Sequence, residues 1–137
     1  MEYIKTILFA GSSMLLLDFV WLSFVATNFY KSQMGSLARL TSSGAFDIKL
    51  LPGGLVYLLM LVGLMVFVFP KVSGASLLYT FFVGGLFGLL CYGIYDFTNM
   101  ATLTAWPWKL AIVDMLWGGF LCGTTSVITI GLLKLFA

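Results

Sequence analysis

Residues 50–69 read LLPGGLVYLLMLVGLMVFVF and contain no charged side chain. A helix needs about 20 predominantly apolar residues to cross the hydrocarbon core of a bilayer. Three further stretches have the same character, at residues 4–28, 76–99 and 107–133. Inside a bilayer only helices or closed barrels satisfy the backbone, and the period-two alternation of barrel strands is absent. The sequence therefore predicts an all-α, polytopic membrane protein built as a bundle of four transmembrane helices.

The composition excludes several classes of protein. Hydrophobic residues make up 61% of the 137-residue chain and charged residues 9%, and the mean hydropathy is +1.10. Soluble domains carry about 25% charged residues, so a soluble enzyme and a disordered chain are both excluded. The formal net charge of +2 is too small for a nucleic-acid surface. Histidine is absent, and Cys91 and Cys122 show no zinc spacing, so we predict no metal site and no cofactor.

The four spans form one domain, residues 1–137, joined by connections of different character. The N-terminal run is similar to a signal peptide, but Asp18 interrupts it and no cleavage pattern follows, so we predict an uncleaved first helix. Residues 29–49 are polar, and they fit either a short interfacial helix or a solvated loop. Lysine and arginine divide three against four between the two sides, so the positive-inside rule assigns no orientation.

Three of the four aspartates lie within predicted spans, at Asp18, Asp96 and Asp114. An ionised aspartate at the centre of a membrane helix costs about 2.5–3.5 kcal/mol on insertion scales. These side chains should therefore face the interior of the bundle and find partners there. Because successive helices alternate in direction and rise about 1.5 Å per residue, all three acids fall in the same half of the membrane.

Aromatic and amide side chains accompany the acids at helical spacing. Trp21 and Trp117 each follow an aspartate by three residues, which places acid and indole on one helical face. An indole N–H can donate to a carboxylate. In the third span, Tyr92 precedes Asp96 by four residues and Asn99 follows it by three. We assign no catalytic residue. The predicted binding cluster is Asp18, Trp21, Tyr92, Asp96, Asn99, Asp114 and Trp117.

Small residues recur at four-residue intervals in the third and fourth spans. Such spacing lets membrane helices approach closely, so we predict a tight pair of these two helices with the acids toward one end of their seam. The second span has Tyr57 as its one polar side chain, and we predict that this helix serves as an apolar wall. The small residues are Gly84, Gly88, Gly118, Cys122 and Ser126.

A longer motif surrounds the acid of the third span. Residues 92–107 read YGIYDFTNMATLTAWP, and residues 17–22 read LDFVWL. Over essentially its whole length, the chain resembles the domain of unknown function 2177 family of small bacterial membrane proteins. The resemblance implies a multi-pass protein of the bacterial inner membrane with no demonstrated activity. The genes of such families often lie near lipid-modifying enzymes, which points toward lipid chemistry. The motif singles out Asp18, Asp96, Asn99, Trp106, Pro107, Asp114 and Trp117.

Three functional interpretations stay open. The first, which we favour, is binding or modification of a membrane lipid or a lipophilic small molecule. A carboxyl pair could supply acid and base there, so enzymatic activity is undecided. The second is a proton- or cation-coupled small transporter that works as a homodimer, with Asp18 as the exchanging carboxyl. The third is a structural or accessory subunit whose aspartates only stabilise the bundle. No nucleic-acid partner is expected.

Overall fold

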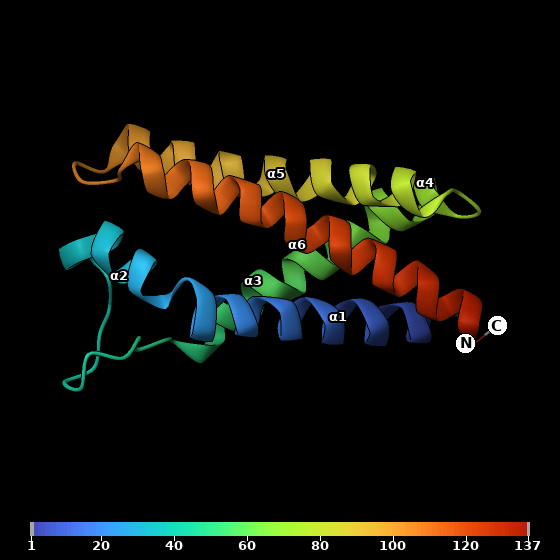
Figure 1. Ribbon diagram of the computed structural model, residues 1–137, viewed down its shortest axis with the longest axis horizontal. Coiled ribbons are helices and arrows are strands. Elements are labelled where there is room, and N and C mark those ends of the chain that lie inside the picture. Colours follow the sequence, from blue (N-terminus) through green and yellow to red (C-terminus); the bar gives the residue numbers. More distant parts are fainter. Residues whose placement is uncertain (1, 137) are drawn as a thin grey trace.

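The computed structural model describes residues 2–136 (Figure 1). Within this range, four helical segments are long and apolar enough to cross a membrane: Glu2–Val25, Leu50–Val72, Leu77–Thr102 and Trp108–Leu135. The prediction of an all-α bundle with four transmembrane helices is therefore confirmed. Large apolar side chains cover the outward surfaces of these helices, as expected where the solvent is lipid.

The first span ends in a wide helical turn. α1 (Glu2–Val20) passes directly into a π-helical turn, η1 (Trp21–Val25). The amide of Ala26 donates to the carbonyl of Trp21, five residues back, at 2.8 Å. Ala26 itself has φ −112° and ψ 1°, so the helical path breaks at this residue.

Two short helices follow in the connection to the second span. They are α2 (Thr27–Met34) and a 3₁₀ turn, η2 (Gly35–Leu37). Of the two alternatives considered for residues 29–49, each describes a part: residues 29–37 are helical, and residues 38–49 form a non-helical connection. The helical part begins at residue 27, because the break at Ala26 ends the first span before the predicted residue 28.

The second span also contains a π-helical turn. It consists of α3 (Leu50–Gly63), η3 (Leu64–Val68) and α4 (Phe69–Val72). Pro70 stands at the beginning of α4. The hydrogen-bonding pattern changes here from π-helical to α-helical. Proline has no amide hydrogen, so residue 70 needs no acceptor at this change. The helical structure thus continues to residue 72, beyond the predicted end at 69.

The third and fourth spans are continuous helices. α5 (Leu77–Thr102) begins after Ser76, whose Oγ accepts a hydrogen bond from the amide of Tyr79 at 3.2 Å. α6 (Trp108–Leu135) begins directly after Pro107, a position at which the fixed φ of proline suits a helix start. Figure 1 shows these two helices running side by side as an antiparallel pair, with α1 and α3 on one side of them.

Glycines bring α5 and α6 into backbone contact. A Cβ built on Gly88 would lie 2.0 Å from the carbonyl oxygen of Gly118, and one built on Gly84 would lie 2.8 Å from the carbonyl oxygen of Cys122. Side chains at these positions would force the helices apart. The predicted tight pair of the third and fourth helices is confirmed by these distances.

We expect Gly88→Ala to destabilise the bundle, because its methyl group would collide with the backbone of α6 rather than with a flexible side chain. Overpacking of this kind costs about 1–3 kcal/mol. Gly131→Ala is the matched control, since a Cβ on Gly131 meets no atom within 4 Å. Thermal unfolding in detergent should give a lower midpoint for Gly88→Ala alone, and equal midpoints would contradict the close contact.

Candidate functional site

Asp18 is held by donors from two other helices. The side chain is 6% exposed. Nε1 of Trp117, on α6, donates to its Oδ1 at 2.8 Å, and the hydroxyl of Tyr57, on α3, donates to its Oδ2. Both carboxylate oxygens therefore have partners inside the bundle. The prediction that the second helix is only an apolar wall is wrong, because Tyr57 supplies one of these donors.

Asp114 is bonded by a residue outside the four spans. The hydroxyl of Tyr30, on α2, donates to Oδ1 of Asp114 and accepts a hydrogen bond from Nε1 of Trp21 at 3.2 Å. Burial and the neighbouring Asp114 carboxyl raise the pKa of Tyr30 above its ordinary value, so the hydroxyl stays a donor. Tyr30 was not among the predicted site residues; it lies in the polar connection, which contacts α6 after the break at Ala26.

Two tryptophans, each three residues after an aspartate, connect the hydrogen bonds of Asp18 with those of Asp114. Trp21 and Trp117 stack with their ring centroids 4.3 Å apart and their planes 5° from parallel. Trp117 donates to Asp18 of the first helix, whereas Trp21 donates to Tyr30, the partner of Asp114. Neither indole therefore bonds the aspartate of its own helix, and each bonds a residue of another helix instead.

Asp96 is the exception among the three acids. It is fully buried, and Nε1 of Trp106 donates to its Oδ1 at 2.9 Å. Its Oδ2 has no hydrogen-bond partner among residues 2–136. The carboxyl of Asp114, on α6, is a neighbour of the Asp96 carboxyl. We call Asp96 and Asp114 the acid pair.

Tyr92 and Asn99 occupy less central positions. The ring of Tyr92 fills the space over Gly118, where an added Cβ would lie 2.3 Å from a ring carbon. Asn99 is half-buried one turn beyond Asp96, and its backbone carbonyl accepts a hydrogen bond from the amide of Leu103 at 2.8 Å. Tyr92 thus packs the helix seam, and Asn99 lies at the end of α5. The predicted residues that join the hydrogen-bonded network are Asp18, Trp21, Asp96, Asp114 and Trp117.

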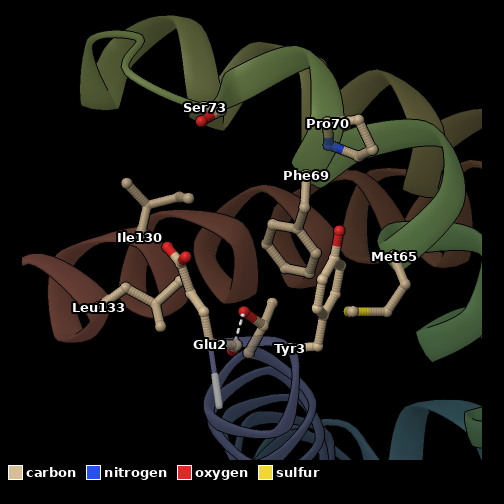
Figure 2. Close-up of a pocket in the computed structure, with 9 residues that line it drawn as sticks. Glu2, Tyr3, Met65, Phe69, Pro70, Ser73, Ile130 and Leu133 are labelled. Atoms are coloured by element: carbon tan, nitrogen blue, oxygen red, sulfur yellow. Dashed lines mark hydrogen bonds between the residues drawn. The ribbon is translucent and has the colours of Figure 1, made fainter. Parts of the chain in front are cut away.

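A cavity of about 260 Å³ lies far from this network (Figure 2). It opens between the beginning of α1, α4 and the end of α6, and its lining includes Glu2, Phe69, Ser73 and Ile130. Glu2 precedes Asp18 by 16 residues along α1, a rise of about 24 Å. This cavity contains none of the predicted site residues, so it is a separate feature at the other end of the bundle.

The model of a known protein family matches most of the chain. The model of the family described as predicted membrane protein DUF2177 matches residues 3–131. The chain belongs to the DUF2177 family. The matched range includes all three membrane aspartates and each of their aromatic partners. Comparisons of this DUF2177 chain with curated proteins and with solved structures found no match.

For this DUF2177 protein, Tyr57→Phe should lower stability by about 1–3 kcal/mol, because it removes one donor and leaves Oδ2 of Asp18 buried without a partner. Tyr79→Phe is the control, since Tyr79 is 52% exposed. Chemical or thermal unfolding in the same detergent gives the comparison. If both variants were as stable as the parent, the bond to Asp18 would contribute nothing.

The raised pKa of Tyr30 predicts that the stability of the fold decreases at alkaline pH. Because this pKa is raised in the folded protein, the folded chain keeps a proton that the unfolded chain loses above about pH 10. The stability contributed by Tyr30 is present below that pH and declines as the pH rises further. Subtracting the tyrosinate absorbance titration of Tyr30→Phe from that of the parent protein isolates this group. A difference step at the ordinary tyrosine pKa would contradict the buried donor.

Proposed function

We propose that the protein resides in the inner membrane of a bacterium and binds a lipophilic molecule there, with the polar head of that molecule at the acid pair. The observation that supports this proposal most directly is Oδ2 of Asp96, which is fully buried and has no partner within residues 2–136. A buried acceptor without a hydrogen bond costs about 1–3 kcal/mol. A ligand that donates to this oxygen would remove that cost.

The surroundings of the acid pair favour a head group that donates hydrogen bonds, an amine or a hydroxyl. The donors that reach the three aspartates are neutral indole and phenol groups, so they leave negative charge uncompensated. A phosphate or carboxylate head would meet like charge at this position. Trp106 and Tyr30 meet the pair through their N–H and O–H groups and bring no positive charge. A long-chain amine or alcohol is the ligand class that fits this chemistry.

Asp96→Asn tests the site with little disturbance of the fold. The asparagine oxygen can still accept from Trp106, and a neutral amide is less costly to bury than a carboxylate, so we expect this variant to unfold no earlier than the parent protein. The substitution replaces Oδ2 of Asp96, an acceptor without a partner within residues 2–136, with an amide group that donates. Native mass spectrometry after incubation with hexadecylamine or hexadecanol should show a retained probe on the parent and none on Asp96→Asn. Asp47→Asn, on an exposed connection, should retain the probe.

The same measurement separates the proposal from a purely structural role. Equal retention by the parent and Asp96→Asn would show that the acid pair does not hold the head group. If the parent retained neither probe, while Asp18→Asn and Asp114→Asn failed to fold, the aspartates would serve the bundle alone.

A proton- or cation-coupled transporter is the second candidate, and the neighbouring carboxyls of Asp96 and Asp114 favour it. A like charge nearby favours the protonated form of a carboxyl, and a cation that takes the place of this proton would release it. Asp18 is less suited to this exchange, because both of its oxygens already accept hydrogen bonds. Vesicles that contain the protein, with an imposed pH gradient, should then accumulate the lipophilic cation ethidium and release protons as they do so. Probe retention without proton movement would identify binding without transport.

A further inference from the structure

An apolar groove lies on the outward face of the α5–α6 pair, beside the acid pair. Its volume is about 530 Å³, and Gly93 and Met115 line it where the helices meet, with Ile94 and Phe97 in its wall. A second apolar groove of about 400 Å³ shares Leu89 with the first. The groove next to the acids is called the seam groove below.

We propose that the seam groove holds one alkyl chain of the ligand whose head group binds the acid pair. This inference rests on the proposed function and specifies its ligand as a molecule with at least one long chain. The groove and the acids lie at the same level of the bundle. Gly93 precedes Asp96 by three residues on α5, and Met115 follows Asp114 directly on α6.

The length of the seam groove matches one chain of one leaflet. Its lining on α5 extends from Leu89 to Ala101, a rise of about 18 Å at 1.5 Å per residue. This is somewhat more than half of the roughly 30 Å hydrocarbon core, the depth that a single lipid chain can reach. A head group at Asp96 leaves about 10 Å of this length between it and Leu89, so the tail points toward Leu89 and continues into the second groove, which shares that residue.

The cross-section of the seam groove also favours a chain over a helix. The groove is a valley between two helices whose backbones touch, and exposed Ile94 and Phe97 rise beside it. An α-helix is about 10–12 Å wide with its side chains, so it would rest on these rims. A chain of methylenes can lie on the floor between them.

Met115 separates the seam groove from the interior of the helix pair. Its Cγ, Sδ and Cε lie 3.3–3.4 Å from the position of a Cβ on Gly93, so the side chain occupies the space that this glycine leaves. The unbranched thioether chain adapts to irregular space more readily than other apolar side chains. Movement of Met115 therefore opens the way from the alkyl chain to the acid pair.

Photolabelling tests the groove directly. Hexadecylamine with a diazirine near the end of its chain is added at low mole fraction to nanodiscs that contain the full protein, and labelled residues are located by peptide mass spectrometry. We expect labels concentrated near Leu89 and Leu90, above the background on the exposed face of α1 at Leu8 and Leu15. Ile94→Trp, in the wall of the groove between Asp96 and Leu89, should lower groove labelling roughly tenfold because chain contacts are lost. Ser12→Trp, at an exposed position of α1, should leave labelling unchanged.

The outcomes distinguish the groove from the head-group site. Labels in the groove that disappear in Asp96→Asn support both. Labels that persist in the groove of Asp96→Asn support the alkyl site and overturn the head-group site at the acid pair. Labels that depend on Asp96 but lie elsewhere overturn the seam groove and keep the head-group site. Cross-links between two copies of the chain across Ile94, with the groove closed to the probe, would assign this face to a dimer and overturn the alkyl site.

Discussion

The backbone contact between Gly88 and Gly118 determines where the acids of the last two helices lie. The helices touch at these glycines and run antiparallel, so equal steps away from the contact lie opposite each other along the seam. Asp96 lies two four-residue steps beyond Gly88, and Asp114 lies one step before Gly118. The two carboxyls are therefore offset by about one helical turn, roughly 6 Å along the seam, and a larger residue at either glycine would separate the helices that carry them. The glycine spacing is therefore a condition for the acid pair as well as for helix packing.

The aspartates also determine how the first half of the chain is attached to the α5–α6 pair. Asp18 accepts donors from α3 and α6, and Asp114 accepts one from α2. No water is present in hydrocarbon to replace a lost donor, so these bonds favour one arrangement of the helices. Asp96 accepts only the indole of Trp106. This difference separates two acids that hold the bundle together from one that keeps an acceptor free.

The fold was largely predictable from sequence because its main signals belong to single helices. Apolar length marks the four spans, and glycine spacing marks the tight pair. The partners of the acids were not predictable in the same way, since they depend on how one helix is rotated against another. Tyr30 reaches Asp114 only because a π-helical turn and the break at Ala26 redirect the chain, and no residue pattern marks that turn. Tyr57 was visible as the one polar residue of its span, and that isolation was the signal to follow.

The surroundings of the free Asp96 oxygen indicate the direction from which a ligand would arrive. Trp106 bonds Asp96 from the α5–α6 connection, and its ring meets Tyr95 edge-on with centroids 5.7 Å apart. Tyr30 covers the other acid from α2. A polar molecule coming from water would have to break one of these hydrogen bonds. A lipophilic molecule in the bilayer meets Gly93 and the flexible Met115 instead. Displacing one apolar side chain costs less than leaving a buried carboxylate without its donor, so approach through the lipid is the easier route.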